Sequence, residues 1–123
     1  MKHILLIEDD PFLVDIYTTK LKEAGFEVSI AKDGHTALKH LKKQRPDLVL
    51  LDIVLPHTDG WEILEEIKGQ EEFKDLLIII LSNLGQKQEV EKGLDLGATK
   101  YLIKAHYKPS EIVEEIKKIL KEE

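Results

Sequence analysis

Five short apolar runs alternate with stretches of helical spacing, and this alternation limits the fold more than any other feature of the chain. The runs occupy residues 4–7, 28–31, 48–51, 76–81 and 101–103. Three of them are continuous rather than alternating, which is typical of strands that are buried on both faces. Strict alternation of strand and helix predicts a parallel sheet with helices on both faces, because each crossover is right-handed.

The stretches between the runs repeat apolar residues every three or four positions, as amphipathic helices do. The stretch 86–96 is the weakest of them, since Val90 and Leu94 are its main apolar residues and Gly93 lies inside it. Residues that favour helix ends stand at the borders of these stretches. They are Asp10 with Pro11, Asp59 with Glu62 as a reciprocal capping box, and Pro109 at helix starts, and Gly25 and Gly97 at helix ends.

Length and composition narrow the class of protein. At 123 residues the chain fits one domain, which we expect to span residues 1–123. The absence of cysteine excludes disulfides, thiol catalysis and cysteine-ligated zinc. A net charge of −6 argues against direct nucleic-acid binding, which needs clustered Lys and Arg. The longest apolar run, six residues, cannot span a bilayer, and nothing resembles a signal peptide, so we expect a cytoplasmic protein without membrane contact.

Polar and charged residues follow the predicted strands, at the edge where parallel sheets bind ligands. They are Glu8, Asp9 and Asp10 after the first run, Asp52 after the third, Ser82 after the fourth and Lys104 after the fifth. A cluster of carboxylates repels itself, so it needs a cation or a retained proton. Its oxygen ligands favour a hard cation such as Mg²⁺, and Lys104 can pair with a carboxylate or a phosphoryl oxygen. One carboxylate is then free to act as a nucleophile and form an aspartyl phosphate.

At these positions the chain resembles the receiver domain of two-component response regulators. The matching segments are ILLIEDD, LVLLDIVLPHTDG, IIILSN and GATKYLIK, in this order and at similar intervals over nearly the whole chain. The resemblance implies a flavodoxin-like α/β fold, a doubly wound (βα)5 arrangement whose five parallel strands have the order 2-1-3-4-5. It also implies a signalling domain rather than an enzyme, one that catalyses only its own phosphorylation and dephosphorylation.

The resemblance assigns roles to the residues of the site. It implies that Asp52 accepts the phosphoryl group and that Ser82 and Lys104 contact the phosphoryl oxygens. Ser82 is also implied to act as a switch with Tyr101, whose ring changes rotamer when the hydroxyl residue moves toward the phosphate. The metal is implied to be Mg²⁺, with Mn²⁺ as a substitute. Its implied ligands are Asp9, Glu8 through water, Asp52 and the main-chain carbonyl of Val54.

Three positions depart from the usual receiver pattern. Asn83 stands where most receivers have Ala, and Ala105 stands where Pro, often in a cis peptide, usually follows the lysine. The next proline, Pro109, comes one residue later than in the commonest pattern. These departures predict an altered loop before the last helix, with less effect on phosphorylation itself.

The predicted function is a phosphorylation switch. A sensor histidine kinase or a phosphotransfer protein would donate the phosphoryl group. An unidentified protein target would recognise the altered surface of the fourth helix, fifth strand and fifth helix, which could also form a phosphorylation-dependent dimer of an otherwise monomeric protein. Apolar Val54 and Leu84 lie two positions beyond Asp52 and Ser82 and orient water poorly, which predicts slow dephosphorylation.

Other classes fit these residues less well. An interaction module that uses the same fold without phosphorylation would not need the acids and the lysine, all of which are present. A flavodoxin would carry a Ser/Thr/Gly-rich loop after its first strand, where this chain has Glu8, Asp9, Asp10 and Pro11. A haloacid-dehalogenase-type phosphatase would have Asp-x-Asp there and an additional cap. The five histidines show no metal-ligand spacing, and Asp10 is more simply explained as a helix cap.

Overall fold

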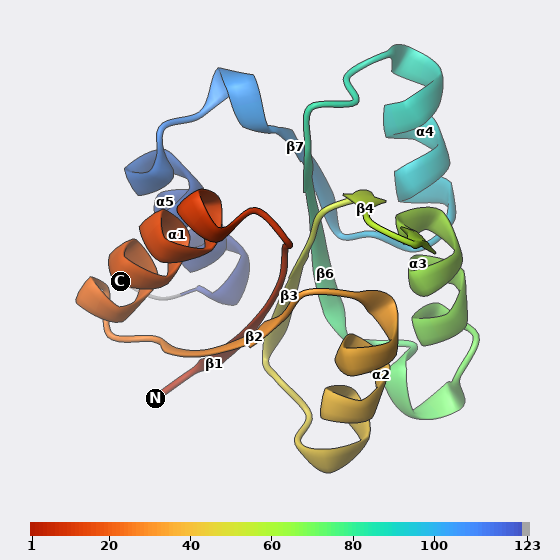
Figure 1. Ribbon diagram of the computed structural model, residues 1–123, viewed down its shortest axis with the longest axis horizontal. Helices are drawn as coiled ribbons and strands as arrows, with labels where there is room; N and C mark the ends of the chain where they lie inside the picture. The colour runs from red at the N-terminus through yellow and green to blue at the C-terminus, as the bar shows by residue number, and fades with distance from the viewer. Residues whose placement is uncertain (122–123) are drawn as a thin grey trace.

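The computed structural model describes residues 1–121, and a sheet of five parallel strands runs through its centre (Figure 1). The strands are β1 (His3–Ile7), β2 (Glu27–Ala31), β3 (Leu48–Leu51), β6 (Leu77–Ser82) and β7 (Lys100–Ile103). They lie in the order β2-β1-β3-β6-β7, and each neighbouring pair is parallel. Because a small hairpin takes the labels β4 and β5, this is the predicted order 2-1-3-4-5. The predicted flavodoxin-like, doubly wound fold is confirmed.

Helices cover both faces of the sheet, as the alternation predicts (Figure 1). They are α1 (Pro11–Glu23), α2 (Gly34–Lys43), α3 (Gly60–Lys68), α4 (Lys87–Asp95) and α5 (Pro109–Leu120). Helices α1 and α5 pack on one face, and α2, α3 and α4 lie on the other. None of the helices within residues 1–121 is both long enough and apolar enough to pass through a lipid bilayer.

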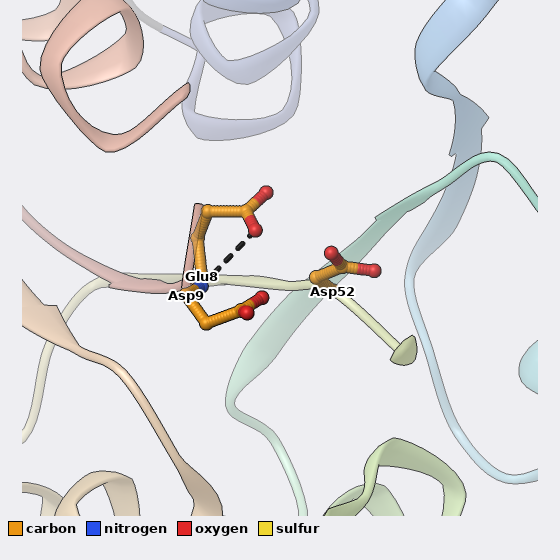
Figure 2. Close-up of side chains that lie close together, drawn as sticks. All are labelled: Glu8, Asp9 and Asp52. Carbon is orange, nitrogen blue, oxygen red and sulfur yellow. Dashed lines mark hydrogen bonds between the residues drawn. The ribbon is translucent and has the colours of Figure 1, made fainter. Parts of the chain in front are cut away.

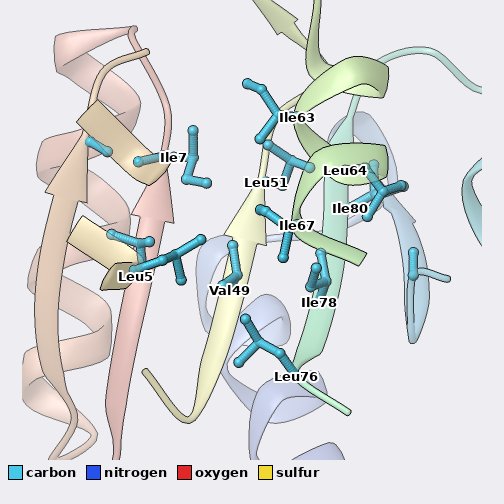
Figure 3. Close-up of a cluster of buried hydrophobic side chains, with 14 of the residues drawn as sticks. Leu5, Ile7, Val49, Leu51, Ile63, Leu64, Ile67, Leu76, Ile78 and Ile80 are labelled. Atoms are coloured by element: carbon cyan, nitrogen blue, oxygen red, sulfur yellow. The ribbon is translucent and has the colours of Figure 1, made fainter. Parts of the chain in front are cut away.

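Alternate residues of the central strands supply two separate apolar layers, because successive side chains of a strand point to opposite faces. In β3, Val49 and Leu51 belong to the layer under α2 and α3, whereas Leu48 and Leu50 belong to the layer under α1 and α5. Figure 3 shows the first layer, in which Ile63, Leu64 and Ile67 of α3 lie against the strands. Burying one such side chain contributes roughly 1.5–3 kcal/mol, so the two layers together fix which face of each element points inward.

The predicted helix ends agree with the structure except in one detail. Asp10 caps α1 by accepting hydrogen bonds from the main-chain N–H groups of Phe12 and Leu13, and Pro11 is the first helical residue. Gly25 and Gly97 follow the helix ends with φ of +93° and +109°, in the left-handed region that favours glycine.

The difference lies at the start of α3. Asp59 caps this helix through the N–H of Trp61, and the cap seen there is this single bond rather than the reciprocal capping box expected with Glu62. The ring of the same Trp61 also reaches α4, because the ammonium of Lys92 in that helix lies 4.6 Å from the ring centre. Trp61 therefore sits between α3 and α4.

The sequence did not predict a short hairpin between β3 and α3. Its strands, β4 (Val54–Leu55) and β5 (Thr58–Asp59), have two residues each, which is too short for a periodic pattern. The hairpin brings Gly60 against the main chain of Ile53, where a Cβ added to the glycine would lie 2.4 Å from Ile53 Cα. Gly60 is therefore required for this close approach.

Two 3₁₀ turns were also not predicted, namely η1 (Glu71–Phe73) and η2 (Lys104–His106). The second lies in the loop before α5, where the departures at residues 105 and 109 predict an altered conformation. The described residues contain no cis peptide bond, so the Lys104–Ala105 bond is trans. Residues 122–123 of the expected domain lie outside the described part of the chain.

Candidate functional site

The site lies at the carboxyl ends of the central strands. Glu8 and Asp9 directly follow β1, and Asp52 directly follows β3. The main-chain N–H of Asp52 donates to the carbonyl of Ile7, and the N–H of Glu8 donates to the carbonyl of Ala31, both at 3.0 Å. These bonds extend the parallel pairing by one residue and hold both acids at the sheet edge.

Lys104 is the cation of the site. Its Nζ donates to Glu8 Oε1 at 2.7 Å and to Asp52 Oδ2 at 2.8 Å. The side chains of Lys104, Glu8 and Asp52 are only 10%, 2% and 8% exposed. Removing charges from water is costly, so this lysine and its acids are stable at this depth because they are paired and hydrogen-bonded.

Burial and pairing act in opposite directions on the pKa values of these groups. Burial raises the pKa of Glu8 and outweighs the hydrogen bond from Lys104, which lowers it. Burial would lower the pKa of the Lys104 ammonium, but its hydrogen bonds to Asp52 and Glu8 outweigh burial and raise it. Lys104 therefore keeps its positive charge at neutral pH, which a contact to an anionic phosphoryl oxygen requires.

Three carboxylates gather beside this lysine. Glu8, Asp9 and Asp52 each place a carboxylate oxygen within 4.8 Å of the others. Figure 2 shows the Asp9 carboxylate directed toward Asp52, whereas Glu8 lies on the other side of the strand end and accepts from the N–H of Asp9. Glu8 is thus occupied by Lys104 and by main-chain N–H groups, and the Asp9 carboxylate has more freedom to bind a cation directly.

All but one of the residues predicted for the site line a single open pocket of about 390 Å³. It is lined by Glu8, Asp9, Asp10, Leu13, Asp52, Val54, Ser82, Asn83 and Lys104. Tyr101 is the one predicted residue that does not line it. All protein ligands predicted for the metal therefore lie at one place, and their oxygen atoms suit a hard divalent cation. Asp10 lies there too, but its side chain is used as the cap of α1.

Ser82 and Tyr101 meet at the main chain of Leu84 instead of contacting the acids. Ser82 is fully buried as the last residue of β6, and its Oγ accepts from the N–H of Leu84 at 3.3 Å. The Tyr101 hydroxyl donates to the carbonyl of Leu84, and burial raises the pKa of this hydroxyl. One residue thus links the two side chains predicted to switch, and the sequence carried no signal for it.

Asn83 and Ala105 also contact each other. The main-chain N–H of Ala105 donates to Asn83 Oδ1 at 3.1 Å. Both residues stood out in the sequence as departures from the receiver pattern. Their contact could not be found there, because 22 positions separate them along the chain.

The fold and this pocket define a flavodoxin-like domain with a ligand site at the carboxyl edge of its sheet. More particularly, the response regulator receiver domain matches residues 4–117, and the chain belongs to this family. Receiver domains are signalling modules of two-component systems, in which they act with histidine kinases.

Solved structures and sequence relatives agree with this assignment. A CheY-like receiver domain protein from Methanospirillum hungatei superposes with a TM-score of 0.89 at 28% identity, over 98% of this chain and 94% of that one. The Mn²⁺-bound form of response regulator Rcp1 superposes with a TM-score of 0.86 at 30% identity, over 98% and 94% of the two chains. The family thus includes members that bind a divalent metal.

One sequence relative is the DNA-binding dual master transcriptional regulator RpaA of Synechocystis, which is 36% identical over 104 residues. The match covers 85% of this chain but 43% of RpaA, so the chain spans less than half of that relative's length. Because RpaA is a DNA-binding protein, the prediction that this chain binds no nucleic acid gains no support from its relatives.

Proposed function

We propose that residues 1–123 act as one receiver domain, in which Asp52 accepts a phosphoryl group from a phosphohistidine of a sensor histidine kinase or phosphotransfer protein. The observation that carries this proposal is the position of Lys104, whose ammonium bridges Asp52 and Glu8 inside the acidic pocket. A lysine held there pairs with the Asp52 carboxylate before phosphorylation and could pair with a phosphoryl oxygen on the same residue afterwards. A location in the cytoplasm and the lack of direct nucleic-acid contact stay predictions of the sequence.

The proposed reaction is an in-line phosphoryl transfer. A lone pair of an Asp52 carboxylate oxygen forms the new P–O bond, while the P–N bond of the donor breaks and its electrons leave with the imidazole. Asp52 Oδ1 accepts from the N–H of Val54 at 3.1 Å, and Oδ2 accepts from Lys104. These two bonds fix the orientation of the carboxylate before the donor arrives.

Lys104 and Ser82 are proposed to bind the phosphoryl oxygens after transfer, as charge-assisted and hydroxyl donors. The residues that would hold Mg²⁺, or Mn²⁺ in its place, are Asp9, Asp52, the carbonyl of Val54 and, through water, Glu8. When bound, such a cation supplies positive charge that stabilises the transferring phosphoryl group.

The output is proposed to pass through Ser82 and Tyr101. To donate its hydroxyl to a phosphoryl oxygen, Ser82 Oγ would have to move toward Asp52, and this movement would draw it away from the N–H of Leu84, from which it now accepts. Since Tyr101 is anchored to the carbonyl of the same residue, movement of Leu84 changes the surface formed by α4, β7 and α5. The phosphoryl group shifts this equilibrium only by binding one arrangement more tightly than the other.

Intact mass after incubation with acetyl phosphate and Mg²⁺ tests the proposal. We expect the wild type to gain one phosphoryl group, and we expect this gain to vanish in Asp52→Asn or after removal of the metal with EDTA. Asp75→Asn, which changes an exposed aspartate outside the pocket, is the matched control and should be phosphorylated normally. A folded wild type that gains no mass would favour an interaction module that works without phosphorylation.

A further inference from the structure

The hydrogen bond between Asn83 and Ala105 depends on both departures from the receiver pattern. Asn83 Oδ1 accepts it and the main-chain N–H of Ala105 donates it, at 3.1 Å. An alanine at position 83 would lack the acceptor, and a proline at position 105 would lack the donor. The two unusual residues therefore make one contact that neither could make alone.

This contact joins the segments that carry the two proposed phosphoryl ligands. Asn83 directly follows Ser82 at the end of β6, and Ala105 directly follows Lys104 in η2. The two strands are paired up to Ser82, which lies opposite Ile103. Beyond this point the chain departs toward α4 on one side and α5 on the other (Figure 1). The bond thus links the segments where the pairing of the sheet has ended.

Packing gives the backbone beside Lys104 little support of its own. Ala105 and His106 are exposed, whereas the Lys104 ammonium must stay within hydrogen-bonding distance of two carboxylates. A lysine side chain has many rotamers, and its position is only as well defined as the backbone from which it extends. A bond to the next residue is a direct way to restrict that backbone.

We propose that Asn83 is a positioning residue, whose side-chain oxygen couples the segment after Ser82 to the segment that carries Lys104. This inference rests on the proposed phosphorylation of Asp52. Because Asn83 is bonded to Ala105, a shift of Ser82 toward a phosphoryl oxygen also moves the backbone of Lys104. The hydroxyl and the ammonium then approach the phosphoryl group together.

Three variants separate the effect of the hydrogen-bond acceptor at position 83 from the effect of side-chain size. Asn83→Leu keeps a similar size and shape and removes the acceptor. Asn83→Asp retains an acceptor oxygen at the same place. Gln88→Ala removes an exposed amide side chain from the first turn of α4 and serves as the matched control.

Amide hydrogen exchange of Ala105 tests the contact without phosphorylation. Residue 83 is remote in sequence, so its substitution leaves the intrinsic exchange rate of this amide unchanged. We expect Asn83→Leu to accelerate exchange about fivefold, as loss of one typical hydrogen bond does. Asn83→Asp and Gln88→Ala should exchange like the wild type. An unchanged rate in Asn83→Leu would overturn the proposal, since the contact would then not hold Ala105.

The rate of phosphorylation by acetyl phosphate and Mg²⁺ tests the positioning role. We expect Asn83→Leu to lower the rate at saturation by about fivefold, with no change in the half-saturating acetyl phosphate concentration, because the pocket keeps its size while Lys104 loses its alignment. Gln88→Ala should match the wild type in both values. The added charge of Asn83→Asp would repel the donor, so that variant is confined to the exchange measurement.

The two measurements together distinguish the possible failures. Faster exchange with an unchanged phosphorylation rate in Asn83→Leu would overturn the proposal, because the bond would then be structural only. A wild type that is not phosphorylated would refute the proposed function, and with it the role of Asn83, even where exchange confirms the contact.

Discussion

At the scale of single residues, the charge of the site bears on both its stability and the metal proposed for it. Glu8, Asp9 and Asp52 carry three formal negative charges and Lys104 carries one positive charge, which leaves −2 on this cluster; Asp10, which also lines the pocket, is used as the cap of α1. A divalent cation would neutralise this remainder. Lys104 already bridges the two most buried acids, and Asp9, which lies nearer to solvent, is available for the cation. Lys104 thus stabilises the two most buried acids, while an excess of negative charge remains that a divalent metal would balance.

The lifetime of the phosphorylated form is a prediction at this scale. Val54 is 59% exposed beside Asp52 and has no group that could orient an attacking water, so we expect the phosphoryl group to last for minutes or longer. Val54→Asn should shorten this lifetime several-fold, less than the roughly hundredfold effect of a fully positioned general base. The decay of the phosphorylated mass after removal of acetyl phosphate measures the lifetime in the wild type and in the variant. Loss within seconds in the wild type would contradict the prediction.

At the scale of elements, the position of Tyr101 on β7 depends on a glycine in α4. A Cβ at Gly93 would lie 2.5 Å from Ile80 Cδ1 and 2.9 Å from Tyr101 Cδ2. The residue that makes the helix weak by propensity therefore gives the Tyr101 ring room to lie under it and to reach the carbonyl of Leu84.

Substitution of this glycine tests the dependence. Gly93→Ala gains helix propensity but overpacks the contact, and we expect a net loss of about 1 kcal/mol in the free energy of unfolding, together with displacement of the Tyr101 ring. Urea unfolding measures the first and ring NMR shifts of Tyr101 measure the second. In a Tyr101→Ala background the cost should shrink. An equal cost in both backgrounds would show that Tyr101 does not depend on the space at Gly93.

Elements also show where prediction from the sequence succeeds and where it stops. The five central strands and five helices were predictable because each is long enough to display a period or a continuous apolar run. Glu8, Asp52 and Lys104 could be placed in one pocket because parallel strands bring their carboxyl ends to one edge. The β4–β5 hairpin is too short for a pattern. The bond of Asn83 and the space under Gly93 arise from tertiary contacts between residues far apart in sequence.

At the scale of the whole molecule, a pair of histidines sits where α2 packs on the sheet, away from the acidic pocket. His3 of β1 is 5% exposed and shares a hydrogen bond with Ser29 through Nε2, and its ring centre lies 5.6 Å from that of His40 in α2. Within residues 1–121, neither Nδ1 atom of these histidines has a hydrogen-bond partner. Burial, followed by the nearby His3 and Lys43, lowers the pKa of His40.

The lowered pKa of His40 predicts how the stability of the molecule depends on pH. The pKa of His40 is lower in the folded state than the ordinary histidine value of about 6.5. As the pH falls through about 6.5, residue 40 therefore takes up a proton in the unfolded chain before it does so in the folded protein. The free energy of unfolding should therefore fall as the pH decreases from about 6.5 through the lowered folded pKa, and this contribution should then level off. Urea unfolding near neutral pH and near pH ~5 measures the difference.

Two variants identify the source of that dependence. His40→Gln should flatten the pH profile, because residue 40 then binds no proton in either state. His106→Gln, which changes an exposed histidine near the pocket, should leave the profile as in the wild type. A profile that is equally steep in His40→Gln would exclude His40 as its cause.

The placement of Trp61 between α3 and α4 has an optical consequence. The chain contains one tryptophan, so all of its indole emission originates at this interface, where the ring lies 4.6 Å from the ammonium of Lys92. Both the intensity and the wavelength of indole emission respond to a nearby charge and to water. The molecule therefore carries a built-in fluorescent reporter on the face that includes α4, and rearrangement of that helix can be followed in unlabelled protein.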